Sequence, residues 1–445
     1  MRIINRDRVD GYRGIWFELG QKENKYGDKY SGGLGTYTAK HVPLAVYAPE
    51  TNKTFFVYGG ARADNERYLF AMASYFDHDR GVVARPTVVH DKEGVDDPHD
   101  DPSIAIDSEG HIWVFVSGRA RMRPGYRYRS VEPYSTAEFE RIDEIEMTYP
   151  QPTWHDDTGF LLLFTKYTGV RELYWSMSVD GRQWSSDQKL AGMGGHYQTS
   201  CRVGERVFTA FNMHPIGNVD VRTNLYFAQT ADNGSSWSAA DGKALETPMT
   251  DIHCPALVND FMLERRLVYM KDITVDADGN PVILVVTSAN HRPGPGGDPR
   301  IWTIAHWSGG VWTFREVTRS THNYDMGSLY VETDGTWRII GPTEAGPQRH
   351  GTGGEMAVWT SGDSGITWGM SRQITSNSVR NHSYARRPIR IGGGDPHPDF
   401  YAFWADGNPD KLSISRLYFA NREGDVVRRF PAAMSHEFAE PEEVK

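Results

Sequence analysis

Three copies of one short turn signature constrain the fold more than any other feature of the sequence. Each copy reads Ser/Thr-x-Asp-(x)-Gly-x-x-Trp, and the copies lie at Ser178–Trp184, Thr230–Trp237 and Ser361–Trp368. Asp and Gly close the turn, the hydroxyl binds its backbone, and Trp packs beneath it. This signature, the Asp-box, is typical of the rims of propeller blades, so it predicts architecture rather than catalysis.

A longer repeat fills the sequence between these turns. Each unit has an apolar strand, a turn with Asp, Glu or Gly, and a second apolar strand. A spacing of roughly 50 to 70 residues suits four-stranded blades. The sequence therefore predicts an all-β protein, a seven-bladed β-propeller that forms one domain over residues 1–445, with the stretch His291–Arg300 as a loop insertion. The seven units are Pro43–Tyr58, Pro102–Val116, Pro152–Phe164, Ser200–Phe211, Pro255–Met270, Ser328–Ile340 and Tyr384–Trp404.

The composition limits the classes of partner. The net charge of −10 excludes general attraction to nucleic acid or anionic lipid, and no apolar stretch is long enough for membrane insertion. An anionic substrate would therefore need a local cluster of positive charge. The two cysteines, Cys201 and Cys254, make no disulfide framework. Residues 1–7 contain no apolar signal segment, so a cytoplasmic protein and one with a removed signal peptide both stay open, as does the oligomeric state.

Propeller geometry selects the positions where chemistry is expected. The innermost strand of each blade starts at one face of the central channel, and the loop after the second strand returns to that face. Residues before the first strands are rich in His and Tyr: His41, His99, Tyr149, His196, Tyr197, His253, Cys254, His322, Asn323, Tyr324 and His382. The loops after the second strands add Arg119, Arg121, Arg123, Arg127, Arg129, Lys166, Tyr167, Arg171, His214, Arg222, Glu344, Arg349 and His350. We expect these side chains to converge on a basic funnel that binds an anion.

A thiol and several imidazoles among these positions suggest a zinc site. The candidate ligands are His196, His214, Cys254 and His322, from neighbouring predicted blades. Four protein ligands would leave no open coordination position, so the zinc would be structural. The alternative is a buried free cysteine beside hydrogen-bonded histidines.

Four sequence blocks resemble a known enzyme family. The blocks Gly11–Phe17, Lys29–Tyr37, Lys53–Gly60 and Asp97–Ser103 are similar to those of the BNR-repeat propellers among the polysaccharide lyases. The likeness is greatest to the ulvan lyases of family 25 and weaker to those of family 24. It implies cleavage of ulvan, a sulfated polymer of rhamnose and uronic acid, by a secreted or periplasmic enzyme. It also implies a bound zinc.

The resemblance implies roles for individual residues. His99 matches the catalytic histidine of the family, and Tyr167 is the preferred catalytic tyrosine, with Tyr197 as the alternative. Arg171, or an arginine of the 119–129 loop, would face the uronate carboxylate. The other funnel residues expected at the substrate are Tyr197, Arg119, Arg222, His41 and Tyr324.

Two other functions remain open at this point. A sialidase-type hydrolase needs two placed carboxyl groups, or a Tyr nucleophile with a Glu partner, and the funnel positions offer acids. These acids are Asp97, Asp100, Asp101, Asp325, Glu344 and Asp406. A glycan-binding propeller would bind the polymer without turnover. The excess of His, Tyr and Arg favours β-elimination, because that reaction needs a neutralised carboxylate, a base and an acid.

Overall fold

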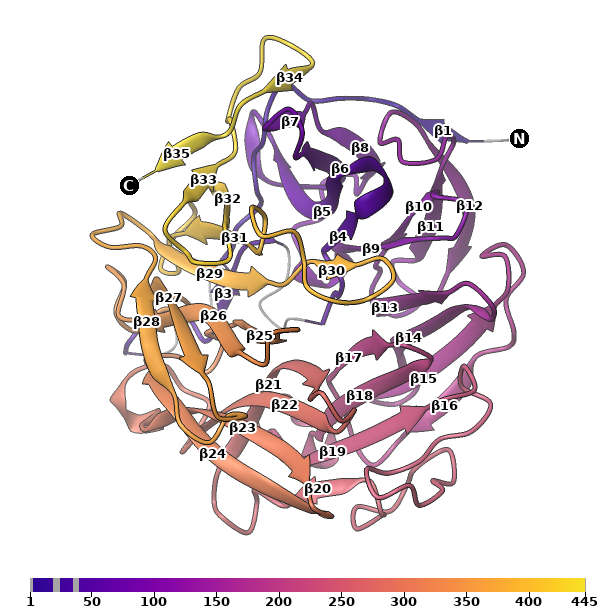
Figure 1. The fold of residues 1–445 in the computed structure, drawn as a ribbon, viewed down its shortest axis with the longest axis vertical. Coiled ribbons are helices and arrows are strands. Elements are labelled where there is room, and N and C mark those ends of the chain that lie inside the picture. The colour runs from indigo at the N-terminus through magenta and orange to yellow at the C-terminus, as the bar shows by residue number, and fades with distance from the viewer. Residues whose placement is uncertain (1–2, 19–24, 35–39, 445) are drawn as a thin grey trace.

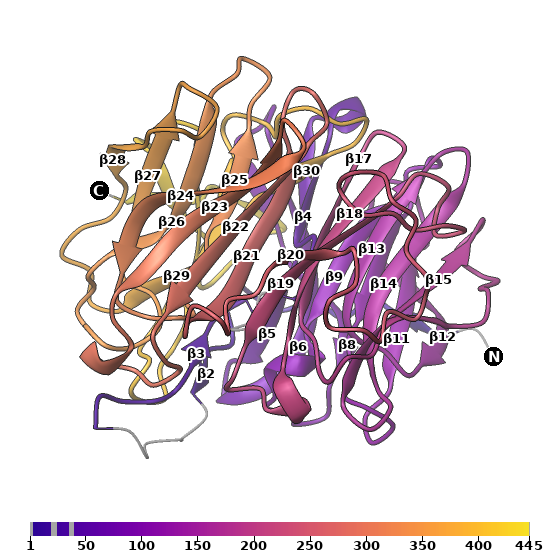
Figure 2. The same cartoon turned by 90° about the horizontal axis from the view of Figure 1, so that it is seen from below.

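The computed structural model describes residues 3–18, 25–34 and 40–444, so the block 29–37 is described only to residue 34. The described chain is almost entirely β-structure, and seven sheets of four or more strands surround a central channel (Figure 1). Figure 2 shows the same ring from the side. A two-stranded ribbon of β2 (Phe17–Glu18) and β3 (Ser31–Gly32) stands apart from these sheets. The predicted all-β class and propeller arrangement are confirmed.

Six of the sheets are regular blades, in which four antiparallel strands pair in chain order. The second sheet contains β9 (Pro102–Ile106), β10 (Ile112–Val116), β11 (Gly125–Ser130) and β12 (Phe139–Ile145), with β1 (Ile4–Asn5) at its edge. The third contains β13 (Thr148–His155), β14 (Gly159–Tyr167), β15 (Arg171–Ser178) and β16 (Gln188–Ala191). The fourth contains β17 (Gln198–Val203), β18 (Arg206–Met213), β19 (Thr223–Thr230) and β20 (Leu257–Asn259).

The other three regular blades follow along the chain. The fifth sheet contains β21 (Leu267–Val275), β22 (Pro281–Ser288), β23 (Arg300–Ser308) and β24 (Val311–Ser320). The sixth contains β25 (Ser328–Val331), β26 (Trp337–Glu344), β27 (Glu355–Ser361) and β28 (Gly369–Gln373). The seventh contains β29 (Asn381–Arg386), β31 (Ala402–Gly407), β32 (Leu417–Ala420) and β33 (Val427–Arg429), with β35 (Glu442–Val444) at its edge.

The first sheet is composite, so the prediction of seven blades is wrong and the blades number six. Its strands are β4 (Ala45–Ala48), β5 (Lys53–Arg62), β6 (Asn65–Asp77), β7 (Val82–Ala84), β8 (Thr87–Asp91), β30 (Ile389–Arg390) and β34 (Phe438–Ala439). The outer position is divided between β7 and β8, which pair with different parts of β6. Pro86 lies between these two strands and offers no backbone N–H for a continuous ladder.

Strands from the C-terminal part of the chain close the ring onto the first sheet. β30 pairs in parallel with β4, and β34 pairs with β7. Figure 1 shows the yellow C-terminal segment beside the indigo first sheet. A single apolar cluster also joins the seventh, first and second sheets, with Phe56 and Phe400 stacked at its centre. Covalently distant ends of the chain are therefore held together by the same core.

One predicted unit is misplaced. Residues 255–270 were expected to hold the two inner strands of the fifth blade, yet β20 is the outer strand of the fourth sheet, and the fifth begins at β21. His253 and Cys254 therefore precede an outer strand rather than an inner one. The predicted loop insertion is confirmed, since residues 289–299 connect β22 to β23.

Short 3-10 turns are the only helices among the described residues. They are η1 (Pro49–Thr51), η2 (Pro98–Asp100), η3 (Pro215–Gly217) and η4 (Pro295–Gly297). No helix in the described part of the chain has the length and apolar character to cross a membrane.

The three Asp-boxes form the turns between the third and fourth strands of the third, fourth and sixth sheets. In the first box the amides of Arg182 and Gln183 donate to Asp180 at 2.8 and 2.9 Å, and the Trp184 indole donates to the carbonyl of Gly181 at 2.8 Å. Gly181 has φ +71°, and a Cβ atom there would lie 2.3 Å from the Trp113 ring of the second sheet. The box thus docks one blade against its neighbour.

We expect Gly181→Ala to destabilise the protein more than Gly242→Ala. Both glycines have a positive φ, but only at Gly181 would a Cβ atom clash with a neighbouring side chain. Gly242 has φ +81°, and a Cβ atom there would meet no atom within 4 Å, so Gly242→Ala should cost about 1 kcal/mol of strain. The clash with Trp113 should add about 1–3 kcal/mol for Gly181→Ala. Urea unfolding of both variants measures the difference; equal losses would contradict docking through this glycine.

Candidate functional site

The inner strands begin at one end of the channel and bring a compact group of His, Tyr and Arg side chains together. The aromatic rings form a chain of contacts in which His99 stacks on Tyr149 with centroids 5.2 Å apart. Tyr149 meets Tyr197 at 5.6 Å, and Tyr197 meets His214 at 4.7 Å. His41 packs on the other side of Tyr149 at 5.2 Å. The predicted convergence of pre-strand residues is therefore present for the first four sheets.

A carboxylate fixes the orientation of His99. Asp97 caps the turn η2, where its carboxylate accepts the backbone N–H of His99 at 3.0 Å and also contacts Nδ1 of the ring. The other oxygen of Asp97 accepts Arg119 at 2.7 Å and Arg123 at 2.6 Å. Although burial alone would raise it, the hydrogen bonds from His99 and the positive charge of Arg119 hold the pKa of Asp97 well below its usual range. Asp97 is therefore a fixed anion.

These contacts determine the protonation of His99. Burial lowers the pKa of His99 below its ordinary value of 6.5, and the carboxylate of Asp97 only partly opposes the shift. The ring is therefore neutral at pH 7, with its proton on Nδ1 facing Asp97 and a lone pair on Nε2. Nε2 is enclosed and has no hydrogen-bond partner among the described residues. An oriented neutral imidazole with a free lone pair is a competent general base.

Tyr167 and Arg171 form the more accessible part of the group. They lie on either side of the turn between β14 and β15, and Arg171 Nε donates to the Tyr167 hydroxyl oxygen at 3.1 Å. Burial raises the pKa of Tyr167, although the charge of Arg171 opposes the shift. Tyr167 therefore stays protonated at neutral pH, which fits a tyrosine that donates a proton.

Positive charge is concentrated beside these rings. Arg222 lies 4.6 Å from the ring centroids of both Tyr197 and Tyr269, and it donates to the Tyr324 hydroxyl at 2.7 Å. Burial, with Arg222 and Arg171 nearby, lowers the pKa of Lys29 to about 8. The predicted cluster of positive charge is thus present in this acidic protein. The guanidinium of Arg222 is stabilised by the faces of tyrosine rings, which do not cancel its charge as a carboxylate would.

Several residues expected to contact substrate are buried instead. His41 is 0% exposed and shares a hydrogen bond with the carbonyl of His99, while Tyr324 is 1% exposed beneath Arg222. Both support neighbouring side chains in this conformation, and their contact with substrate stays a prediction. The guanidinium of Arg119 donates a hydrogen bond to Asp97. The side chains of Tyr197 and Arg222 are almost completely buried.

Sequence reasoning missed two members of the group. Tyr149 was noted before the third blade but given no role, although it contacts His99, His41 and Tyr197. Its backbone has φ +55°, an uncommon conformation for a bulky residue that often marks functional sites. Tyr269 was missed because the fifth inner strand was placed too early in the chain.

The residues predicted to bind zinc are not brought together. Both ring nitrogens of His196 are engaged, since Nδ1 donates to the carbonyl of Asn212 at 2.8 Å and Nε2 accepts the Met193 amide at 3.1 Å. Cys254 lies before the outer strand β20, away from the channel end that holds His214 and His322. The four residues therefore do not fit one metal ion.

A cavity of about 540 Å³ lies elsewhere, at the opposite ends of the inner strands. Its walls include Ile106, His155 and Arg202, which lie at or near the ends of β9, β13 and β17. The catalytic candidates lie near the beginnings of the same strands, at the other face of the propeller. We therefore do not assign the reaction to this cavity.

Comparisons with known proteins agree with this architecture. No curated protein sequence matches the chain. The structure is similar to that of a PL25 ulvan lyase, with a TM-score of 0.68 and 16% identity over 95% of this chain and 96% of that one, and the same values hold for a structure bound to -[GlcA(1-4)Rha3S]-. The polysaccharide lyase Uly1 has a TM-score of 0.62 and 13% identity over 95% of this chain and 99% of its own. These likenesses concern the fold. A model of BNR repeat-containing proteins matches residues 61–320, and the chain belongs to that family.

Proposed function

We propose that this protein is a polysaccharide lyase that cleaves an ulvan-type polymer, sulfated and rich in uronic acid, by β-elimination. The observation that carries the proposal is the neutral His99, fixed by the anion Asp97 and placed among tyrosines and arginines. The similarity in fold to ulvan lyases supports the same reaction class.

The reaction divides among these side chains in three parts. Arg171 neutralises the uronate carboxylate, so that the proton on C5 becomes more acidic. His99 Nε2 takes that proton, and the electron pair of the C5–H bond forms the C4–C5 double bond as the C4–O4 bond breaks. Tyr167 gives its hydroxyl proton to O4 of the leaving sugar. The proton taken by His99 returns to the tyrosinate through solvent.

The geometry favours Tyr167 as the acid. Its hydroxyl oxygen accepts from Arg171, which leaves the hydroxyl hydrogen available for a substrate oxygen. The charge of Arg171 also stabilises the tyrosinate that forms when the proton leaves. Because His99 Nε2 is enclosed, substrate must displace a neighbouring side chain before it reaches that atom.

Hydrolysis by a pair of carboxyl groups is less well supported, because four of the six candidate acids are engaged in structural contacts. Asp97 accepts Arg119 and Arg123, Asp100 binds Arg123 and Lys92, Asp325 accepts backbone amides at His322 and Gly353, and Asp406 accepts Arg380. Asp101 is fully buried, which leaves Glu344 as the one half-buried acid of the six without a cationic partner among the described residues. A glycosidase normally needs two placed carboxyl groups.

A polymer substrate also bears on where the enzyme acts. An algal polysaccharide is too large to cross a membrane unaided, so we place the activity outside the cytoplasm, in the periplasm or the medium. This localisation follows from the proposed substrate alone.

We expect His99→Ala and Tyr167→Phe each to lower turnover of ulvan by about 10²–10⁴-fold, because each removes a proton-transfer group. The measurement is the ultraviolet absorbance of the unsaturated uronate. His155→Ala and Tyr68→Phe, which alter the same residue types away from the group, should retain wild-type turnover. Wild-type rates in His99→Ala would exclude it as the base, and loss in Tyr149→Phe with activity kept in Tyr167→Phe would transfer the acid role to Tyr149.

Asp97→Asn tests how the base is oriented. An amide can donate to Nδ1, which moves the histidine proton to Nε2 and blocks the base, so kcat should fall by about 10²–10⁴-fold. In the wild type, activity should fall in acid, as pH drops through a His99 pKa below 6.5. Because Asp97 raises that pKa, the acid limb of the residual activity in Asp97→Asn should lie at still lower pH. An unchanged limb, measured on a variant with wild-type thermal unfolding, would contradict the role of Asp97.

A further inference from the structure

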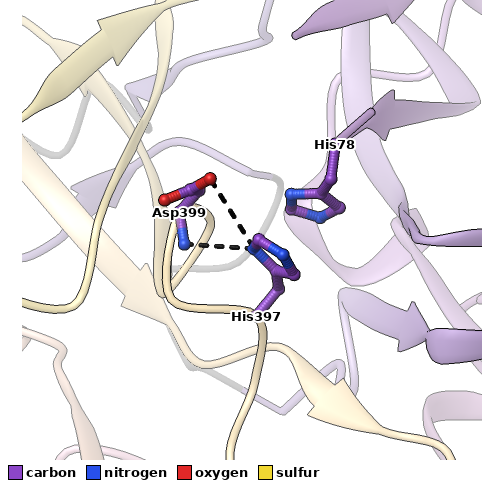
Figure 3. A group of neighbouring side chains, drawn as sticks. All are labelled: His78, His397 and Asp399. Carbon is purple, nitrogen blue, oxygen red and sulfur yellow. Dashed lines mark hydrogen bonds and ion pairs between the residues drawn. The ribbon is translucent and has the colours of Figure 1, made fainter. Parts of the chain in front are cut away.

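Two histidine rings lie face to face at the seam where the ring closes. His78 follows β6 of the first sheet, and His397 precedes β31 of the seventh (Figure 3). Their ring centroids are 3.6 Å apart with an interplanar angle of 30°. The carboxylate of Asp399 approaches His397 Nδ1 at 4.0 Å, and one ligand atom from each of the three residues lies within 4.8 Å of the others.

A carboxylate lies beside the histidine pair. Asp399 approaches His397 Nδ1 at 4.0 Å and supplies negative charge that a cation requires. Imidazole binds a metal ion through the lone pair of a ring nitrogen, so the hydrogen bonds of each ring decide which nitrogen can act as a ligand.

A hydrogen bond selects the nitrogen of His78 that can act as a ligand. Nε2 lies 2.8 Å from the Thr54 hydroxyl, to which it can donate, and this tautomer leaves the lone pair on Nδ1. Nδ1 is buried and has no hydrogen-bond partner among the described residues. Metal-binding histidines commonly have their second nitrogen held in this way. Tyr47 packs edge-on against both rings, at 5.5 and 5.1 Å, and limits their motion.

We propose that His78, His397 and Asp399 form a binding site for a divalent transition-metal ion of the zinc type, which links the first sheet to the seventh. Two imidazoles and one carboxylate are a ligand set that such ions prefer, and water completes the coordination. The backbone N–H of Asp399 donates to His397 Nδ1 at 3.2 Å. This hydrogen bond must break if that nitrogen binds the ion. The site is separate from the channel group and independent of the proposed reaction.

The location gives the ion a structural effect. Strands β4 to β8 of the first sheet meet the C-terminal part of the chain through noncovalent contacts, which include β30 on β4, β34 on β7 and the shared apolar cluster. An ion bound by residues of both sheets binds the closed ring and not the opened one. Its binding therefore stabilises the folded chain by mass action, in proportion to the logarithm of the free metal concentration above Kd.

The test uses the full chain, treated with chelator and then titrated with Zn²⁺ alone. We expect calorimetry to show saturable binding and thermal unfolding to shift to higher temperature as Zn²⁺ rises. His78→Ala and His397→Ala should each weaken this binding by at least about tenfold and remove the shift. Asp399→Asn changes an exposed side chain and leaves both histidine rings in place, so it should weaken Zn²⁺ binding less than the histidine variants do. It provides the test if a histidine variant does not fold.

The control is His436→Ala, which removes an exposed histidine outside the group and should bind Zn²⁺ as the wild type does. Co²⁺ should give a visible absorption band in the wild type that His397→Ala lacks. Absence of binding in the wild type, or equal binding in His397→Ala, Asp399→Asn and the control, would overturn the proposal and leave the two rings as an aromatic stack.

Discussion

Apolar packing between neighbouring sheets holds this molecule together, and the position of every candidate catalytic residue depends on it. Trp113 and Phe115 of the second sheet pack against Phe160 and Leu162 of the third, and comparable clusters fill each successive junction. Because the sheets pack side by side, the beginnings of their inner strands meet at one end of the channel. Residues far apart in the chain, such as His41 and Tyr149, therefore lie in contact.

The site combines a half-buried anion, Asp97, with an excess of cations in a protein of net charge −10. Asp97 is the central element, because one carboxylate orients His99 and also anchors Arg119 and Arg123. Arg222 lies among tyrosine faces, which stabilise a guanidinium without cancelling its charge. A uronate entering this region would meet positive charge, a lone pair and a protonated phenol, the three groups that elimination needs.

The sequence predicted those parts of the fold that local chemistry specifies. The Asp-boxes and six of the seven strand pairs were recognisable because turn residues and apolar alternation are local signals. The fifth pair failed because the long connection after Thr230 ends in the three-residue strand β20, which resembles an inner strand in sequence. The composite first sheet depends on β30 and β34, strands of two residues whose pairing is set by the distant core.

The sequence indicated several residues of the candidate site but not the contacts that orient them. His99, Tyr167 and Arg171 followed from position and resemblance, whereas the roles of Asp97 and Tyr149 depend on a tight turn and an uncommon backbone angle that no spacing rule contains. The four predicted zinc ligands are not brought together, because Cys254 precedes an outer strand and both ring nitrogens of His196 are engaged. The pair His78 and His397 was invisible for the opposite reason, since only ring closure brings those residues together.

Cleavage of the polymer by elimination, rather than by hydrolysis, can be tested directly from the masses of the products. Ulvan is digested in water enriched in ¹⁸O, and the products are analysed by mass spectrometry beside a time-matched blank for exchange at reducing ends. Elimination predicts products in which each new non-reducing end is lighter by one water and cleavage introduces no ¹⁸O. Fragments of full hydrated mass, with ¹⁸O at each new reducing end beyond the blank, would show hydrolysis and contradict the account.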